Sequence, residues 1–501
     1  MLLLARYVIP ISSPPIENGA VLVSDGLIKD VDYATRLRTK YPDEPVHDFG
    51  LAALMPGFID THTHLEYSAM RGLINDSPYA AWKMHLAEKE KLFTLEDWND
   101  SALLGALESV RCGITSIADI TNTGAAFRAA AAVGTHGVIY REIATMDRQA
   151  VDDVFSAAVD DVYGWREQVK QAARADEIVH AIQNDSNVTN MFKAISAEQL
   201  ADQTNKDNSA QETFGAGAAA SGLLQIGVAP SALYQCHPLV FEKVADFAED
   251  GTPVALHLAG SKEEYDFIRY GSSPFSVHAT EQERGFGIDM PPWLATGVSP
   301  VQYILNWGVL DAPNVLAIHC VHVDDNDIEK LADRDVAISI CSRCNAQLGM
   351  GIAPLMKFVR AGMRIGLGTD SPAATDATDM FQEMRIGLLI QRAIGRRSRF
   401  LSAAEMMYMA TLGGARALRM DDRLGSLDAG KVADVIAIDL SNSNQAPTHD
   451  PNAAVVHTAT PDNILMTMIN GEIVYDGQHR HDIDVDRVFA RAEEMRLKLR
   501  G

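Results

Sequence analysis

Short apolar segments alternate with helical stretches through most of this 501-residue chain, and this alternation restricts the fold more than any other feature. Each segment has the length of a buried β-strand, and helical stretches such as 95–113 and 353–362 lie between them. The rhythm is typical of an α/β protein with a parallel sheet. Two arrangements satisfy it, a (β/α)8 barrel and an open, doubly wound sheet. The apolar segments cover residues 54–60, 115–119, 136–142, 224–230, 253–259, 315–321, 336–341 and 363–370.

Both ends of the chain carry a different pattern. Apolar runs flank Asp25-Gly26 near one end and Asn470-Gly471 near the other, and such dipeptides favour β-hairpin turns. We therefore expect a small β-sandwich domain built from both termini, residues 1–54 and 421–480. It would accompany a barrel over 55–420, with a C-terminal helix over 481–501. The length of the chain suits one large barrel and a smaller companion.

Residues 151–222 interrupt the alternation, because they are longer than a connection between a strand and a helix requires. The part over 151–182 has a helical pattern, and the part over 200–222 is polar and rich in Gly and Ala. One interpretation is a surface insertion. The other is a functional segment, either a lid over the site or an oligomer contact.

Side chains that can bind metal ions stand at or close to the ends of four of the apolar segments. His62 and His64 stand at i and i+2 of one strand, so both imidazoles share a face. His257, His319 and Asp370 each end a later segment. Any one of them can be an ordinary polar residue at a strand end. Since the carboxyl ends of barrel strands converge on one mouth, the set together predicts a hydrolytic metal site and favours the barrel.

The chemistry follows from this set of donors. Three imidazoles and one carboxylate leave an open position where a divalent cation can lower the pKa of water and supply hydroxide. Asp370 can bind the metal and also act as general base, and His319 can polarise the electrophile or stabilise an oxyanion. Zn²⁺ fits these ligands, as do Fe²⁺ and Mn²⁺. We expect hydroxide attack on an sp² carbon.

Charge and cysteine content narrow the function classes. A formal net charge of −24 disfavours nucleic acid as a partner, so a small-molecule substrate is expected. The five cysteines are odd in number and widely spaced, which argues against a disulfide framework. No stretch reaches the length of a membrane span, and the first residues lack a signal-peptide pattern. These features predict a cytoplasmic enzyme without membrane contact. A homo-oligomer is a separate expectation, and the residues do not fix its number of subunits.

Several strings together carry a family resemblance: residues 56–64 (PGFIDTHTH), 319–322 (HCVH), 351–355 (GIAPL), 366–371 (GLGTDS), 379–385 (DMFQEMR) and 425–439. With them the chain resembles the amidohydrolase superfamily. The similar branch holds methylthioadenosine/S-adenosylhomocysteine deaminases, chlorohydrolases and aminodeoxyfutalosine deaminases. The resemblance implies metal ligands at His62, His64, His257 and Asp370, with His319 beside the metal as a catalytic group.

Within this branch, three stretches are similar to the aminodeoxyfutalosine deaminases of menaquinone biosynthesis. They are residues 62–69, 261–275 and 341–349. The last of them implies that Arg343 and Asn345 lie near the substrate, although both also suit the start of a helix. Under the same interpretation, Cys341 and Cys344 are loop residues and not metal ligands.

The chain departs from the branch at two positions. The deaminases carry His-x-x-Glu after the third metal strand, and the Glu moves a proton to the ring nitrogen, but Gly260 stands at that position here. Glu263 or Glu264 would have to reach back to replace it. Ser231 stands where relatives place a substrate-binding His, and His237 can substitute only if the loop bends.

Other side chains are candidates for the substrate pocket. Glu66 and Glu142 follow strand ends, and for Glu142 the alternative is a salt bridge at the end of the strand. Trp82 can wall the pocket or be a core residue. Glu90 can align with a ribose-contacting Glu of the resembled deaminases, although its Lys- and Glu-rich surroundings favour a solvated helix face.

Three functional hypotheses remain. The first is an aminohydrolase that deaminates an adenine-type nucleoside related to aminodeoxyfutalosine or methylthioadenosine. The second keeps the metal but hydrolyses a non-purine C–N or C–halogen bond, and the changes at Gly260 and Ser231 motivate it. The third is an inactive barrel with an assembly role, against which the complete set of metal-binding residues argues.

Overall fold

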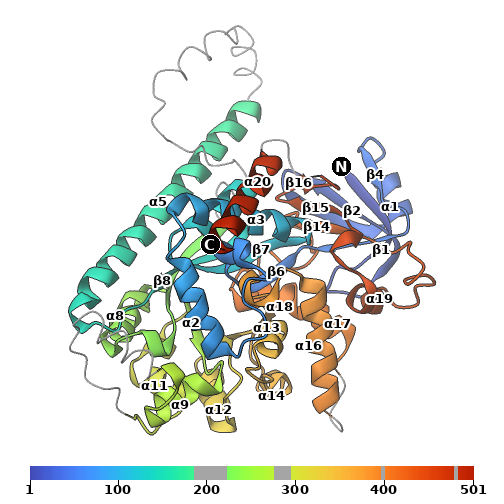
Figure 1. The fold of residues 1–501 in the computed structure, drawn as a ribbon. Coiled ribbons are helices and arrows are strands. Elements are labelled where there is room, and N and C mark those ends of the chain that lie inside the picture. Colours follow the sequence, from blue (N-terminus) through green and yellow to red (C-terminus); the bar gives the residue numbers. More distant parts are fainter. Residues whose placement is uncertain (185–222, 276–294, 396–400, 479–482, 501) are drawn as a thin grey trace, which may run out of the picture.

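The middle of the chain forms a closed parallel barrel (Figure 1). The structure is a computed structural model, and it describes residues 1–184, 223–275, 295–395, 401–478 and 483–500. The barrel strands are β6 (Phe58–Thr63), β7 (Ile114–Thr121), β8 (His136–Ile143), β9 (Leu224–Pro230), β10 (Val254–Leu258), β11 (Val315–His319), β12 (Ala337–Ile340) and β13 (Ile365–Leu367). Their order around the barrel follows the sequence, and β13 pairs with β6 to close it. The predicted (β/α)8 barrel is confirmed, and every predicted barrel segment overlaps one of these strands.

Helices surround the barrel because each apolar strand needs cover on its outer face. The longer helices are α2 (Tyr79–Glu90), α3 (Leu95–Arg111), α4 (Ala125–Val133), α5 (Val151–Asn184), α8 (Pro238–Phe247), α9 (Lys262–Tyr270), α12 (Asp325–Asp333) and α16 (Met380–Ile394). Shorter ones are α11 (Pro300–Asn306), α13 (Ser342–Gln347), α14 (Leu355–Arg360), α15 (Pro372–Thr375), α17 (Ala403–Met409) and α18 (Leu412–Ala417). Local signals set their ends, as at α3, where Thr94 and Asp97 form a reciprocal capping box.

The segment 151–222 divides in two. Its first part is α5, which packs against β8 and β9 and so serves as the outer helix between these strands. Residues 185–222, which include the predicted polar part over 200–222, lie outside the described residues. The helical prediction for 151–182 is confirmed.

A mixed sheet from both ends of the chain lies beside the barrel (Figure 1). Its strands are β1 (Leu2–Val8), β2 (Ile16–Ser24), β3 (Leu27–Tyr33), β4 (Val46–Asp48), β5 (Ala52–Pro56), β14 (Val435–Asp439), β15 (Ile464–Ile469) and β16 (Glu472–Tyr475), with helices α1 (Ala34–Lys40) and α19 (Pro451–Thr458). The predicted segment 54–60 is divided: β5 belongs to this sheet and β6 to the barrel, and Gly57 separates them.

The two predicted hairpin turns meet in this sheet. Asp25, Gly26, Asn470 and Gly471 all have positive φ, as the tight turns of two-residue hairpins require. The backbone N–H of Ala433 donates to Gly26, and that of Gly471 donates to Ala433. A bridge between Leu27 and Val432 joins the start of β3 to the residues before β14, so the sheet folds back on itself.

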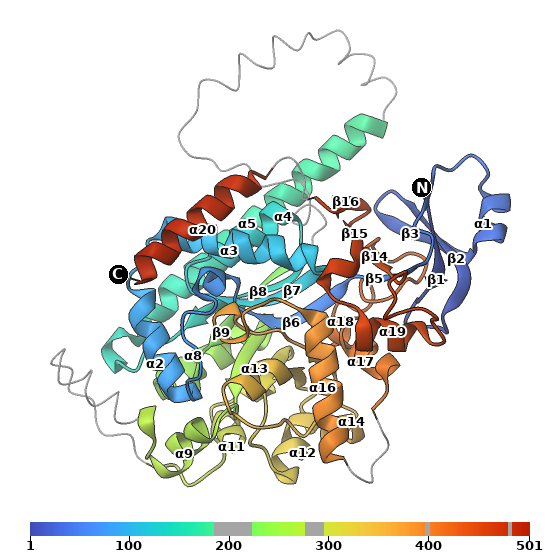
Figure 2. The same cartoon turned by 45° about the vertical axis from the view of Figure 1, so that its right-hand side comes forward.

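The C-terminal helix α20 (Val485–Arg500) lies along α3 (Figure 2). Arg491 donates to Asp100 at 2.7 Å and to Asp97 at 3.1 Å, which pairs two buried carboxylates of α3. Lys89 of α2 donates to the Leu499 carbonyl at 2.7 Å. The helix therefore braces α2 and α3. Among the described residues, no helix is long and apolar enough to cross a membrane.

Candidate metal centre and active-site cavity

The predicted metal-binding side chains meet at the carboxyl ends of the barrel strands. His62 comes from β6, and His64 directly follows this strand. His257 comes from β10 and His319 from β11. Asp370 follows β13, and its backbone N–H donates to the His62 carbonyl at 2.8 Å, which fixes it beside β6. His319 and Asp370 both have positive φ, a conformation that costs free energy for such residues and recurs at functional sites.

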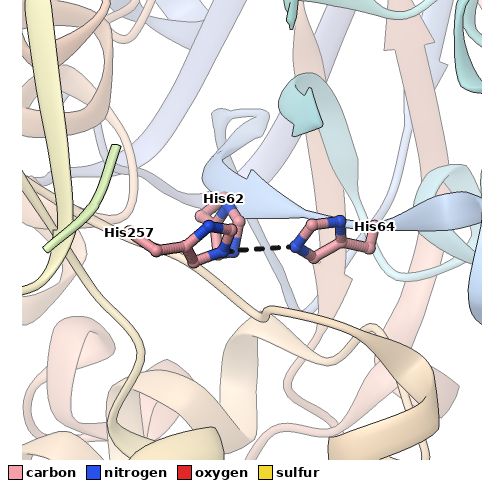
Figure 3. Close-up of side chains that lie close together, drawn as sticks. All are labelled: His62, His64 and His257. Carbon is pink, nitrogen blue, oxygen red and sulfur yellow. Dashed lines mark hydrogen bonds between the residues drawn. The ribbon is translucent and has the colours of Figure 1, made fainter. Parts of the chain in front are cut away.

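The imidazole nitrogens of three histidines converge on one point (Figure 3). Nε2 of His257 lies 3.2 Å from Nε2 of His62 and 3.4 Å from Nε2 of His64. A tetrahedral ion with bonds of about 2.0–2.1 Å to nitrogen holds its ligands about 3.3 Å apart. The spacing of the nitrogens therefore fits a bound cation of the size of zinc.

Hydrogen bonds on the far side of the rings support the same interpretation. Nδ1 of His64 lies 3.1 Å from the Ile120 carbonyl oxygen, which only accepts, so the ring proton stands on Nδ1. Burial lowers the pKa of His64 to about 3 and the pKa of His257 well below its usual range, with the charge of His62 adding to both shifts. The neutral ring of His64 then presents a bare lone pair to His257. A cation between the two nitrogens removes the repulsion of their lone pairs, because both lone pairs can bind it.

Asp370 and His319 complete the centre. One carboxylate oxygen of Asp370 lies 3.5 Å from Nε2 of His62 and the other lies 3.7 Å from Nε2 of His319. Burial alone would raise the pKa of Asp370, but His62, His319 and His64 together hold it well below its usual value. Burial lowers the pKa of His319 to about 4. At neutral pH the centre thus offers an ionised carboxylate at Asp370 and neutral imidazoles at His64, His257 and His319, which are the forms that bind a divalent cation.

A cavity opens at this centre. Its walls contain three of the predicted substrate-binding residues, Trp82, Glu142 and Ser231. Ser231 also touches the metal-binding set, since its Oγ lies 2.8 Å from Nδ1 of His257. The full lining is His64, Tyr67, Tyr79, Trp82, Lys83, Leu86, Glu142, Ser231, Ala232, Tyr234, Gln235, His257, His319, Cys344, Leu348, Asp370 and Ser371.

Comparison with known proteins identifies the family. The model of the amidohydrolase family matches residues 53–474, which is most of the chain. The chain belongs to the amidohydrolase family. The resemblance seen in the sequence is confirmed, and so is the prediction of a hydrolase that acts on carbon–nitrogen bonds.

Relatives of this amidohydrolase share its length. A 5-methylthioadenosine/S-adenosylhomocysteine deaminase of Thermodesulfovibrio yellowstonii is 27% identical over 487 residues, 95% of this chain and 93% of the relative. A protein of the same name from Nitratidesulfovibrio vulgaris is 29% identical over 474 residues, 94% and 90% of the two chains.

Solved structures share its fold. An adenosine deaminase of Xanthomonas campestris with bound zinc has a TM-score of 0.74 at 23% identity, covering 100% of this chain and 98% of the other. An atrazine chlorohydrolase of Arthrobacter aurescens, complexed with zinc, has a TM-score of 0.72 at 21% identity, covering 98% and 99%.

Three other predicted substrate contacts lie outside the cavity lining of this amidohydrolase. The carboxylate of Glu66 accepts hydrogen bonds from Thr121, Thr123 and the backbone at the start of α4, including the Ala125 N–H at 3.1 Å. Arg343 is buried and donates to the carbonyls of Thr375, Ala377 and Asp379. Both side chains therefore fasten loops at the barrel mouth.

Asn345 is the third of these residues, and it lies beside His319. Both polar atoms of its buried side chain lack a hydrogen-bond partner among the described residues, as does Nδ1 of His319. The side chain of Asn345 acts on the pKa of His319, against the lowering by burial. Asn345 is therefore buried near His319 and outside the cavity lining.

The departures at Gly260 and Ser231 also have a structural setting. A Cβ atom on Gly260 would lie 3.0 Å from Cδ2 of His319 and 3.1 Å from Cε of Met350, so a larger side chain would displace His319 or Met350. Glu264 is buried and does reach back, but its carboxylate accepts from the backbone N–H groups of Ala259 at 2.7 Å and Gly260 at 3.3 Å. It supports the turn after His257 and is absent from the cavity lining.

His237 and Glu90 do not face the cavity. His237 caps α8, where its Nδ1 accepts from the Leu239 N–H. Glu90 accepts from the Tyr67 hydroxyl at 3.0 Å.

The cavity also contains residues that sequence reasoning missed: Tyr67, Tyr79, Lys83, Tyr234 and Cys344. One signal was available for part of this group. Tyr79 precedes Trp82 by three residues and Lys83 follows it, so a helix over these positions places all three near one face. Tyr234 stands three residues after Ser231, on the same loop.

Proposed function

We propose that this amidohydrolase is a zinc-dependent deaminase that removes the exocyclic amino group of an adenine-type nucleoside, such as methylthioadenosine or S-adenosylhomocysteine. The observation that carries the proposal is the convergence of four imidazoles and Asp370 at one end of a cavity with aromatic walls. The names of the relatives support the nucleoside, and the zinc in two structures of the same fold supports the metal. Aminodeoxyfutalosine is a third substrate of the same chemical class.

His62, His64, His257 and Asp370 would hold the ion. The chemistry that it supplies when bound is a lower pKa of water, which makes a nucleophile available at neutral pH. The other steps fall to the side chains. Asp370 takes a proton from the attacking water, and the neutral His319 stands where it can steady the oxygen that adds to the ring.

The bonds and protons of the reaction balance with water alone. The water oxygen bonds to the ring carbon, and the bond from this carbon to the exocyclic nitrogen breaks. One proton leaves with ammonia and the other ends on the ring nitrogen. Asp370 can carry the first of these protons to the leaving group.

Gly260 favours a second candidate function. The resembled deaminases protonate the ring nitrogen from a Glu at this position, and here a side chain would collide with His319. A substrate that needs no ring protonation would avoid the problem. A non-purine C–N bond or a C–halogen bond is such a target, and the chlorohydrolase of the same fold adds support.

The five cysteines agree with a cytoplasmic location. All five thiols are buried and none forms a disulfide, as expected in a reducing compartment.

The test is ammonia release by zinc-loaded protein. We expect release from at least one of methylthioadenosine, S-adenosylhomocysteine, aminodeoxyfutalosine and adenosine, with about one zinc ion per chain. The Asp370→Asn variant should lose at least about 10²-fold in rate. If these nucleosides release no ammonia and the protein instead hydrolyses triazines or cyclic amides, the second candidate function is favoured. A chain that binds no stoichiometric metal would instead support the inactive barrel with an assembly role.

A further inference from the structure

Two opposite charges face the cavity in addition to the metal-binding set. Lys83 comes from α2, and Glu142 comes from the end of β8. Among the described lining residues, these are the only charged side chains that the metal centre does not use. Both side chains are partly buried. This pair needs an explanation because the proposed reaction on the ring gives neither residue a role.

Neither charge has a partner within the described part of the chain. No ion pair within 4.0 Å and no side-chain hydrogen bond involves Lys83 or the carboxyl of Glu142, whereas the charges around them are engaged. Glu90 accepts from Tyr67, and Arg141 donates to Asp161 at 2.8 Å.

The two charges nevertheless lie close enough to influence each other. Burial raises the pKa of Glu142 to about 7, and the charge of Lys83 acts against this shift. Their separation is therefore larger than a direct ion pair, yet within the range of an electrostatic interaction. Since both residues line the same cavity, one bound group can contact both.

Partly buried charges without partners cost free energy, and a ligand of complementary charge removes that cost. A purely anionic group such as a phosphate would meet Lys83 but be repelled by Glu142. A purely cationic group would meet Glu142 but be repelled by Lys83. An α-amino acid satisfies both, because one carbon atom carries a carboxylate for Lys83 and an ammonium for Glu142.

We propose that Lys83 and Glu142 bind the carboxylate and the ammonium of an α-amino-acid substituent on the substrate nucleoside. The inference rests on the proposed deaminase function. It selects, within that class, nucleosides with a zwitterionic tail over those with an uncharged one. An ammonium beside Glu142 would also favour the ionised form of its carboxyl.

Binding of reaction products tests the tail without turnover. S-inosylhomocysteine carries the zwitterionic tail and 5′-methylthioinosine an uncharged one. On zinc-loaded full-length protein we expect calorimetry to give a Kd at least about 10-fold lower for the first, since hydrogen bonds to charged groups have this strength. Lys83→Met and Glu142→Gln should each remove most of this difference and leave the Kd of methylthioinosine within about 2-fold.

The control is Lys91→Met, because Lys91 lies just beyond α2 and pairs with Glu88 on the surface. It should keep the full preference. Analogues of S-inosylhomocysteine that lack the carboxylate or the ammonium test the same contacts on unaltered protein, and each should bind about 10-fold more weakly. Kinetics with the two adenine nucleosides should place the effect in KM rather than kcat.

Equal binding of both products by the unaltered protein would overturn the proposal. So would variants that weaken both products to the same extent. Failure of the deaminase function has a different signature, since zinc-loaded protein would then release no ammonia from either nucleoside, whatever its preference for the tail.

Discussion

Ser231 illustrates how a single residue changes its meaning between sequence and structure. The sequence marked it as the replacement of a substrate-binding His. In the structure it lines the cavity, and its hydroxyl also lies against Nδ1 of His257. When the Oγ accepts from the Nδ1 proton, Nε2 of His257 presents its lone pair to the metal. Such outer contacts fix the tautomer of a metal-binding His and its orientation.

Replacement of Ser231 by Ala should therefore weaken the metal centre. We expect zinc affinity to fall by about 10- to 100-fold, as is usual for the loss of an outer partner of a metal-binding His. Competition with a chelator of known affinity measures it. Ser441→Ala, at an exposed position, is the matched control. Unchanged affinity in Ser231→Ala would show that the contact does not orient His257.

Glu264 supports a prediction about pH. Burial raises its pKa from 4.5 to about 7, while its bonds to Ala259 and Gly260 act in the opposite direction. The folded state thus holds a proton that the unfolded state has released. The associated stability is fully present below about pH 4.5 and is lost as the pH rises through about 7.

Glu264→Gln removes this titration and keeps the shape of the side chain. The stability of the unaltered protein relative to the variant should therefore decline between pH 4.5 and 7.5, by a few kcal/mol at most. Urea unfolding at a series of pH values measures this difference. Glu263→Gln, on the same helix but partly exposed, should follow the unaltered protein at every pH. If the difference in stability between the unaltered protein and Glu264→Gln does not change with pH, the raised pKa of Glu264 is contradicted.

At the scale of elements, α2 forms one wall of the cavity and is fastened at both ends. Its first residue, Tyr79, shares a hydrogen bond of 2.8 Å with the Tyr234 hydroxyl across the mouth. Phe275 stacks on Tyr234 with 3.8 Å between ring centroids. At the other end, Lys89 holds the last turn of α20. The helix is therefore positioned by tertiary contacts from distant parts of the chain.

The link between Tyr79 and Tyr234 should hold α2 over the cavity. Tyr79→Phe and Tyr234→Phe should each raise KM by about 3- to 10-fold and cost about 1 kcal/mol of stability. The double variant should add little to either single variant, because both remove the same bond. Tyr33→Phe, at an exposed position, is the control. Additive effects in the double variant would mean that the hydroxyls act separately.

The elements differ in how well the sequence predicts them. Barrel strands such as β10 and β11 are short runs of mostly apolar residues, so their composition and length identify them. The residues of α2 also suggest a helix, but nothing local says that it turns Trp82 and Lys83 into the site. The roles of Glu66 and Arg343 could not be predicted from the sequence either, because their hydrogen bonds join segments that meet only after the barrel closes.

At the scale of the whole molecule, the terminal sheet supports the barrel from the end opposite the cavity. Gly57 connects β5 of the sheet to β6 of the barrel, and its N–H donates to Asp434 beside β14 at 3.1 Å. Thr467 of β15 donates to the Val110 carbonyl near the end of α3 at 2.7 Å. Because these contacts lie at the amino ends of β6 and β7, we infer that the sheet contributes stability and takes no part in the chemistry.

Gly57 is the position where this connection can be tested. A Cβ atom there would overlap the side chain of Thr115, with 2.8 Å to its Cβ and less to the two atoms beyond. Thr115 is buried and branched, so it cannot move aside easily. Gly57→Ala should destabilise the protein by about 1–3 kcal/mol, as overpacking does. Thr115→Ala in the same chain should recover part of this loss, because it removes the two nearest atoms.

The form of the unfolding transition then distinguishes one cooperative unit from two. If the sheet and the barrel depend on each other, calorimetry of Gly57→Ala should give a single transition at a lower temperature, with metal release and loss of helix signal coinciding. Gly164→Ala is the control for the substitution without overlap, because Gly164, like Gly57, lacks a positive φ and a Cβ atom there would meet no neighbour. Two transitions, of which only one shifts in Gly57→Ala, would mean that the sheet unfolds alone and that the barrel holds its metal without it.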